Sequence, residues 1–280
     1  MGTSSSFGGA GPKTPLVPSW LDEPAPAPIL LPVEVPPKQE QPLQTTPPEL
    51  PPISLPPQGD RFRASRANFT RYVKTGDTRS LRSAVSDYVR TGTGGSRGGA
   101  SRMGSVKQAA GRIYGLVQDV RQSGTADALR QLGLGDLVGK PATDGLARLT
   151  DAICPPGGPQ DQAIAREAFV EAVVNLAADG VTDISALTAD QWQSLFLDFI
   201  TRSIEARIIN DIGNKSVTMP TDVKAAQQVE RGLHQLVDGC VKDAFAETLG
   251  KSEVLRDNQI HSAMESIYQV AFAFLENLPS

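Results

Sequence analysis

The sequence predicts an all-α protein: a multi-helix, bundle-like body preceded by a disordered, proline-rich N-terminal arm. Of the 22 prolines, 16 lie in residues 1–60, where they remove backbone hydrogen-bond donors and disfavour helix at each preceding residue. From Phe62 onward the apolar residues recur with helical spacing, and no run longer than a few residues alternates with the period of a strand. We therefore predict an arm over 1–60, a basic helical segment with a glycine-rich loop over 61–123, and an all-α core over 124–280.

The basic segment begins with two short amphipathic helices, the first ending at Gly76 and the second near Gly92. Their apolar faces are Phe62, Phe69, Tyr72 and Val73, then Leu81, Ala84, Val85, Tyr88 and Val89. The stretch GTGGSRGGASRMG contains six glycines and is expected to be a flexible loop. A third helix follows, with a narrow apolar stripe formed by Met103, Val106, Ala110, Ile113, Val117 and Val120.

The helices of the core segment are predicted from their caps and apolar faces. Thr188 followed by Gln191 is a capping box. It opens a helix whose inward residues are expected to be Trp192, Leu195, Phe196, Phe199, Ile200, Ile204 and Ile208. The next helix is expected to begin with Val223 facing inward, and Ser252 is expected to cap a last helix that ends at Leu278.

Charge divides the chain into three parts. Residues 1–60 carry two basic and six acidic residues, residues 61–112 carry 12 and two, and residues 113–280 carry 13 and 23. The net charges are therefore −4, +10 and −10, and the basic block would attract phosphate, an acidic protein surface or the chain's own acidic part. The candidate anion-binding residues are Arg61, Arg63, Arg66, Arg71, Arg79, Arg82, Arg97 and Arg102. Because the aromatic residues here lie on apolar helix faces, a partner-protein surface is favoured over nucleic acid.

No pattern of a catalytic or metal-binding site is found, so we expect a non-enzyme without metal or cofactor. His234 precedes Cys240 by six residues, which places them on different faces of one helix, and Cys240 is expected in the core. The glycine-rich stretch follows a helix and lacks the G-K-[ST] of a phosphate-binding loop. With two cysteines, no secretory leader and no apolar span of about 20 residues, we expect a cytoplasmic protein that does not enter a membrane.

Three stretches of the chain resemble a known family. MGTSSSFGGAGPKTPLVPSWL, FTRYVKTGDTRSLRSAVSDYVRTGTGGSRGGASRMG and ICPPGGPQDQAIAREAF are similar to the B component, QatB, of the four-part Qat anti-phage defence systems of bacteria. The resemblance implies a non-enzymatic subunit that works beside an ATPase, a QueC-like protein and a TatD-like nuclease. Within the arm, residues 22–60 resemble the family in composition alone.

The resemblance also suggests what the arm does. QueC-like enzymes use ATP to activate a deazaguanine carboxylate and couple it to an amine, and a protein amine could replace ammonia there. The resemblance thus assigns Gly2, Thr3 and Ser4 to insertion into the partner's active site, with the α-amine of Gly2 as the group bound or modified. Trp20 and Leu21 are the predicted anchor of the arm.

Three alternatives stay open. Met1, Gly2 and Ser6 match the N-myristoylation pattern M-G-x-x-x-[ST], so lipidation is a rival use of Gly2. A plain solubilising tail is the second alternative. The third is a nucleic-acid-binding adaptor that uses the basic segment 61–112.

Overall fold

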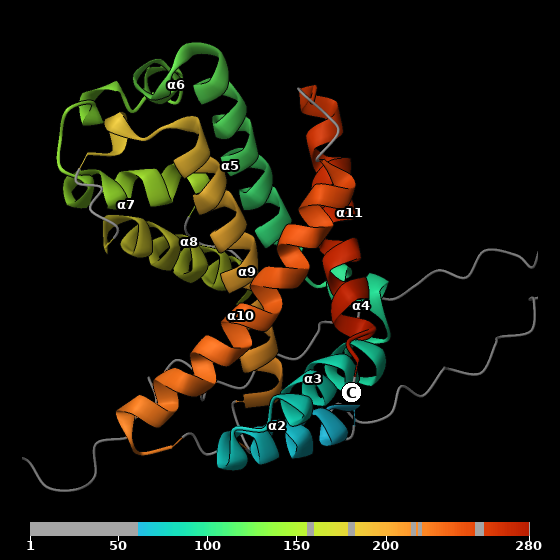
Figure 1. Cartoon of the computed structure of the whole chain (residues 1–280). Coiled ribbons are helices and arrows are strands. Elements are labelled where there is room, and N and C mark those ends of the chain that lie inside the picture. Colours follow the sequence, from blue (N-terminus) through green and yellow to red (C-terminus); the bar gives the residue numbers. More distant parts are fainter. Residues whose placement is uncertain are drawn as a thin grey trace, which may run out of the picture. The chain divides into compact units, whose positions relative to one another are not determined.

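Helices make up most of the chain that the computed structural model describes, which is residues 61–155, 160–178, 183–213, 217, 220–249 and 255–279. Within these ranges the predicted all-α class is confirmed by ten α-helices (Figure 1). Their bounds are α2 Arg63–Thr75, α3 Thr78–Asp87, α4 Ser96–Ser101, α5 Gly104–Ser123, α6 Thr125–Gln131, α7 Ala142–Ile153, α8 Gln160–Ala178, α9 Ala189–Gly213, α10 Val223–Thr248 and α11 Asp257–Glu276. The predicted arm, with Gly2, Thr3, Ser4, Trp20 and Leu21, lies outside the described residues.

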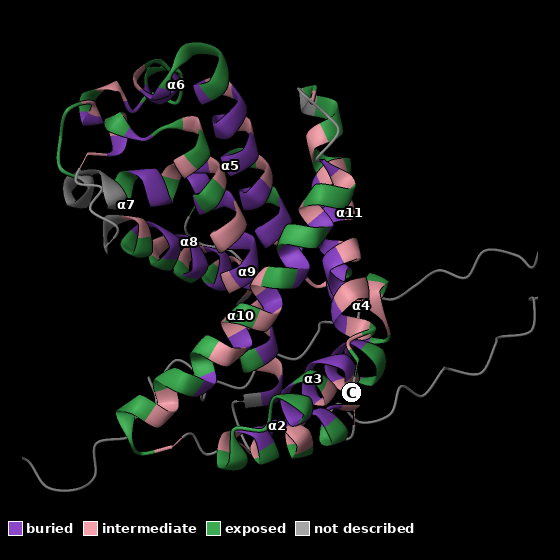
Figure 2. Ribbon diagram, viewed as in Figure 1, coloured by how far each residue is buried: buried purple, intermediate pink, exposed green. Residues whose placement is uncertain are grey.

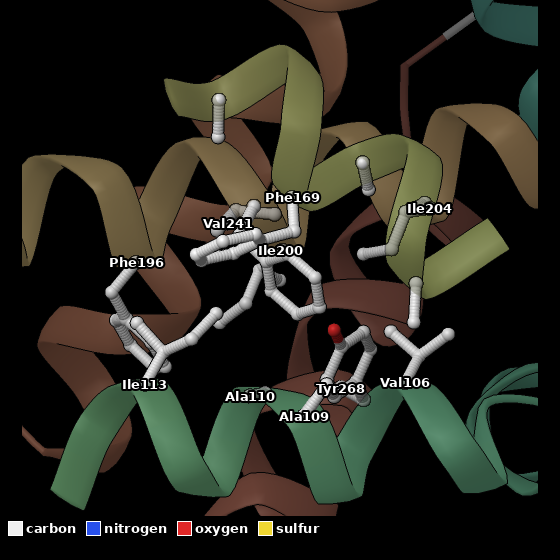
Figure 3. Packing of buried hydrophobic residues seen from close by; sticks show 14 of the residues in the cluster. Val106, Ala109, Ala110, Ile113, Phe169, Phe196, Ile200, Ile204, Val241 and Tyr268 are labelled. Atoms are coloured by element: carbon white, nitrogen blue, oxygen red, sulfur yellow. The ribbon is translucent and has the colours of Figure 1, made fainter. Parts of the chain in front are cut away.

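Helix α9 lies at the centre of the packing, in contact with α5, α8 and α10. All the residues predicted to face inward on it are 0–2% exposed. Figure 3 shows Ala110 and Ile113 of α5 facing Phe196 and Ile200 of α9, with Phe169 of α8 beside them. The predicted apolar stripe of α5 is likewise buried along its whole length, as Figure 2 shows for the helix as a whole. The apolar face of α9 is therefore enclosed by these neighbouring helices.

The C-terminal helix α11 packs against helices near the start of the described chain. It packs on α10 and α5 and also on α3 and α4. Helices α2 and α3 form a hairpin at Gly76, whose φ of 68° is the left-handed conformation that glycine adopts readily. Asp77 then caps α3 by accepting hydrogen bonds from the backbone N–H groups of Arg79 and Ser80. The predicted helix end at Gly76 is confirmed.

The glycine-rich stretch is not the flexible loop that its composition suggested. It continues α3 as a π-helical turn, Tyr88–Thr93, and then forms α4. The glycines admit close neighbours: a Cβ at Gly98 would lie 2.0 Å from the carbonyl oxygen of Thr93, and one at Gly99 would lie 2.7 Å from the Phe272 ring. At Gly98 and Gly99 glycine is needed for close contact between elements, whereas Gly94 and Gly95 have φ of 81° and 93°, which glycine adopts readily.

Helix ends elsewhere follow the predictions in part. The Thr188–Gln191 capping box is present, with both reciprocal hydrogen bonds, at 2.9 and 3.2 Å. Val223 is 67% exposed, so its predicted inward position is wrong; it is the first residue of α10, before that helix reaches its neighbours. Ser252 lies outside the described residues, and α11 begins at Asp257. The division of the chain at residues 60 and 123 stays a prediction, and helices on both sides of 123 share one hydrophobic core.

No helix in the described ranges is long and apolar enough to cross a membrane.

Candidate functional site at the root of the arm

Phe62 is the first apolar residue of the described chain, and it is 6% exposed. The ring stacks on the buried ring of Tyr88, with centroids 5.6 Å apart and an interplanar angle of 18°. On another side it lies against Gly92, where a Cβ atom would come within 2.4 Å of Phe62 Cε1. Only glycine leaves room for the ring at this position. The first apolar side chain after the predicted arm is therefore fixed in a fitted slot.

Asp211 joins the residues around this slot. Its Oδ2 accepts a hydrogen bond from the Tyr88 hydroxyl at 2.9 Å and forms an ion pair with Arg102 Nη1 at 3.1 Å. Arg207, on the same helix as Asp211, donates to the carbonyl oxygen of Arg102. Burial raises the pKa of Tyr88 well above its usual value, and the negative charge of Asp211 adds to the rise. Tyr88 is thus a neutral donor, and the carboxylate of Asp211 connects it to Arg102.

Two guanidinium groups lie near the Phe62 ring. Arg61 Cζ is 5.9 Å and Arg102 Cζ is 6.0 Å from the ring centroid, at the distance of a cation–π contact worth about 0.5–1 kcal/mol each at partly exposed sites. We call Arg61, Phe62, Tyr88, Arg102 and Asp211 the arm root. Stacking, a charge-assisted hydrogen bond and cation–π contacts together hold the Phe62 ring in place.

Glu276, the last residue of α11, forms hydrogen bonds with the segment beside the arm root. The carbonyl oxygen of Glu276 accepts hydrogen bonds from Ser86 Oγ at 2.6 Å and from Arg90 Nη2 at 3.2 Å. The carboxylate of Glu276 accepts from the backbone N–H of Ser96 at 3.0 Å. The π-helical turn and the start of α4 are therefore held by the last residue of the C-terminal helix.

Comparison with known proteins decides the family. The family described as "Qat anti-phage system associated protein QatB" matches residues 94–275, which is more than half of the chain. The chain belongs to the QatB family. It is accordingly a component of an anti-phage defence system. No curated protein and no solved structure matches it.

The part matched to the QatB family holds one side of the arm root. Arg102, Arg207 and Asp211 lie within residues 94–275, whereas Phe62 and Tyr88 precede them. Asp211 and Arg207 were not among the residues singled out from the sequence. They are over 100 positions from Tyr88 and Arg102, and no local pattern links groups so far apart.

The eight arginines predicted to bind anions differ in exposure, three being half-buried and five exposed. Arg61 and Arg102 belong to the arm root and are half-buried, as is Arg66. The remaining five are exposed on the first three described helices: Arg63, Arg71, Arg79, Arg82 and Arg97. A surface of positive charge thus exists over α2–α4, and two members of the predicted set contact an aromatic ring instead.

The histidine and cysteine positions show no arrangement that would hold a metal. In the described ranges, no three or more His, Cys, Asp or Glu residues are grouped as metal ligands. His234 contacts Glu205 rather than Cys240, with Nδ1 and Oε1 3.0 Å apart. Cys154 and Cys240 are both free and buried, and burial raises the pKa of each thiol to about 11.

Proposed function

We propose that this QatB-family chain is a non-catalytic subunit whose helical body docks other subunits and whose arm presents Gly2 to a QueC-like partner for binding or modification. The observation that supports this most directly is the arm root. Phe62 and its neighbours hold in place the start of the described helices, directly after the predicted arm. A fixed base of this kind suits a segment that must deliver its tip to a separate active site.

The chemistry of Gly2 suits an acceptor amine. An α-amino group has a pKa near 8, so an appreciable fraction is neutral and nucleophilic at cellular pH. In coupling, the amine attacks the ATP-activated carboxylate, a C–N amide bond forms, the adenylate leaves and the amine loses a proton. Glycine has no side chain to block a narrow pocket.

The length of the arm is adequate for this task. A proline-rich chain of about 60 residues reaches roughly 180 Å when fully extended at about 3.1 Å per residue. This is several times the diameter of a folded domain. Gly2 could therefore reach a partner's active site while the body stays bound at the partner's surface.

Substitution of Gly2 tests the proposal in cells that carry the whole defence system. Gly2→Leu should block removal of Met1 and entry into a narrow pocket, and should abolish protection against phage. Thr3→Ala, which leaves the amine in place, should have a smaller effect. Full protection with Gly2→Leu would show that the amine is not the working group.

Deletion of residues 2–21 separates the arm from the body. We expect the shortened protein to keep its melting temperature within a few degrees, because the arm root and core lie beyond the deletion, and to lose protection. A larger fall in melting temperature would show that the arm packs on the core and serves as a structural element.

A second function is favoured by the five exposed arginines on α2–α4. These would suit a nucleic-acid-binding adaptor whose contacts are to phosphate. Such a complex should weaken by orders of magnitude between 50 and 200 mM salt, because several counterions are released on binding. Binding to nucleic acid that weakens with salt in this way, and is lost when these arginines become Gln, would favour this function over arm presentation.

A further inference from the structure

Helix α9 leaves one stripe of its surface uncovered. Asp198, Arg202, Glu205 and Ile209 follow one another at intervals of four, three and four residues, so they lie along one face of the helix. None of the four is fully buried, whereas Phe199, Ile204 and Ile208 on the apolar face of α9 are 0% exposed. Eleven residues of helix rise about 16 Å, or three turns. The stripe is therefore long enough to contact a short helix along its length.

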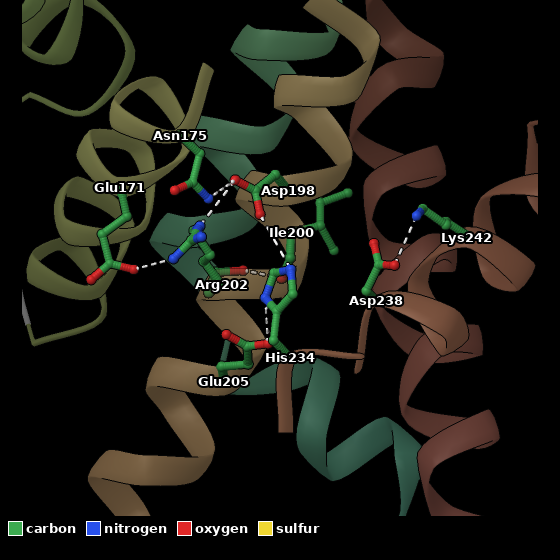
Figure 4. Close-up of polar contacts among 10 residues, drawn as sticks. Glu171, Asn175, Asp198, Ile200, Arg202, Glu205, His234, Asp238 and Lys242 are labelled. Carbon is green, nitrogen blue, oxygen red and sulfur yellow. Dashed lines mark hydrogen bonds and ion pairs between the residues drawn. The ribbon is translucent and has the colours of Figure 1, made fainter. Parts of the chain in front are cut away.

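Helices α8 and α10 flank this stripe and turn it into a groove (Figure 4). A pocket of about 450 Å³ lies there, and its lining includes Glu171 and Val174 from α8, Arg202 and Ile209 from α9, and Glu230 from α10. We call the stripe and this pocket the α9 groove. The α9 groove shares helix α9 with the arm root, and its other lining residues come from α8 and α10.

The α9 groove exposes apolar side chains without a cover. Val174 is 54% exposed and Ile209 is 42% exposed. In the described part of the chain only two other large hydrophobic residues are so exposed, Leu132 and Val223, and neither lines this pocket. Large apolar side chains gathered in a concave site are typical of a surface that another protein covers.

The charges of the α9 groove are fixed in place and mostly negative. Arg202 contacts Asp198 Oδ2 through Nε at 3.0 Å and Glu171 Oε2 through Nη1 at 2.6 Å. His234 Nδ1 lies 3.0 Å from Glu205 Oε1, and its Nε2 lies 3.9 Å from Asp198. With Glu230 the site holds four carboxyl groups against one guanidinium and one imidazole. With His234 protonated and all four carboxyl groups ionised, the negative charges exceed the positive by two; burial raises the pKa of Glu205, so this carboxyl group loses its charge at a higher pH than an exposed glutamate does.

We propose that the α9 groove binds a helical segment of another subunit that presents Lys or Arg side chains between aliphatic ones. The aliphatic side chains would cover Val174 and Ile209, and the cationic groups would lie against Glu171, Glu205 and Glu230. This assignment rests on the proposed function, in which the body docks partner subunits. It adds the surface that does so and the chemistry of the partner.

Charge argues against the chain's own arm as the occupant. Residues 1–60 carry two basic and six acidic residues, so they would be repelled by a site with excess carboxylates. A basic segment of a second copy is the remaining source within this chain, because Arg63, Arg71 and Arg82 are exposed. The oligomeric state distinguishes that occupant from a different subunit.

The test uses the four subunits of the system produced together, with an affinity tag at the C-terminus of this chain so that Gly2 stays free. The variant Val174→Arg/Ile209→Arg places two positive charges in the α9 groove. The controls are Leu132→Arg and Val223→Arg, which change apolar residues of similar or greater exposure outside it. We expect the amount of one co-purified subunit to fall at least tenfold with the double variant and to stay unchanged with the controls.

A second pair of variants tests the charge separately. Glu230→Lys should reduce co-purification of the same subunit severalfold, whereas Glu247→Lys, an exposed change on the same helix outside the pocket, should not. Melting temperatures within a few degrees of the unaltered protein identify the variants that keep their fold. Since Val174→Arg alone changes the more exposed of the two apolar residues, it serves where the double variant does not fold.

The outcomes separate this inference from the proposed function. If the unaltered chain retains no subunit, docking by the body is wrong. If it retains its subunits and the groove variants retain them equally, the α9 groove is not the docking surface. Sedimentation of the chain alone tests whether a second copy occupies the groove. A dimer that dissociates in the Val174→Arg/Ile209→Arg variant would assign the α9 groove to a second copy and overturn the partner-subunit assignment.

Discussion

The hydroxyl of Tyr88 donates a hydrogen bond to the carboxylate of Asp211 at 2.9 Å, across 123 residues of sequence. Through this bond the π-helical turn after α3 is tied to the last turns of α9. The Tyr88 ring stacks at the same time on Phe62, the first apolar residue after the predicted arm. One buried side chain thus connects the start of the described chain to the central helix of the core.

Tyr88→Phe should destabilise the protein by about 1–2 kcal/mol, because a hydrogen bond to a charged acceptor is lost while the ring stays in place. For a folded part of this size, the melting temperature should fall by roughly 2–8 °C. Tyr72→Phe is the control, since the hydroxyl of Tyr72 reaches its carbonyl acceptors only at 3.4–3.5 Å. Equal falls in melting temperature for the two variants would show that the bond to Asp211 contributes no more to stability than the longer hydrogen bonds of Tyr72.

Gly98→Ala should be strongly destabilising, because the new Cβ would meet the backbone carbonyl of Thr93 at 2.0 Å. The opposite is expected at Gly239, in the middle of α10, where a Cβ meets nothing within 4 Å. There, alanine should stabilise the protein by about 0.5–1 kcal/mol through its helix propensity. Urea unfolding of both variants measures the difference; a harmless Gly98→Ala would contradict the close packing of α4 on the π-helical turn.

The ion pair of His234 predicts a dependence of stability on pH. Contact with Glu205 raises the pKa of the imidazole above its usual 6.5, although partial burial opposes the rise. A raised folded-state pKa means that the stabilisation is fully present below pH 6.5 and is lost as pH rises through the folded-state pKa. Because the side chain is 34% exposed, the contribution is small, under about 1 kcal/mol.

His234→Gln checks this dependence. Relative to the unaltered protein, its melting temperature should be lower by about 1–3 °C at pH 6 and nearly equal at pH 9. His261→Gln, at an exposed position on α11, should show no such pH dependence. A deficit of the His234 variant that is constant from pH 6 to pH 9 would refute the role of its charge.

The two cysteines should be inert in the folded protein. Cys154 and Cys240 are 2% and 8% exposed, and burial raises the pKa of each thiol to about 11, so very little thiolate forms near neutral pH. A thiol reagent at pH 8 should label neither residue in minutes and both after unfolding in guanidinium. Fast labelling of one residue in the native protein would show a local opening at that position.

The fold class was predictable because its causes are local. Helical spacing placed the inward faces of α5 and α9 correctly, and the capping box at Thr188 marked where α9 starts. The glycine-rich stretch was misread because composition reports backbone freedom in isolation, whereas Gly92 and Gly99 are placed by rings from distant segments, Phe62 and Phe272. Tertiary contact of this kind leaves no local pattern.

The candidate sites show the same limit of local patterns. Phe62 and Tyr88 were expected on apolar faces, and they are buried, but their common partner Asp211 comes from α9. Of the contacts in the α9 groove, only that between Asp198 and Arg202 has a sequence signature, since residues four apart on a helix are neighbours. Glu171 and His234 reach it from α8 and α10, which sequence spacing alone does not bring together.

The central claim is that the arm delivers the α-amine of Gly2 to a QueC-like partner that binds or modifies it. Its most direct test is the intact mass of this chain and of its N-terminal peptide, purified after production with its neighbouring subunits and compared with the chain produced alone. We predict an added mass that is confined to the peptide beginning at Gly2 and is absent from the chain made alone. An unmodified Gly2 peptide in cells that resist phage would contradict modification, and if the partner also fails to bind that peptide, it would contradict the claim as a whole.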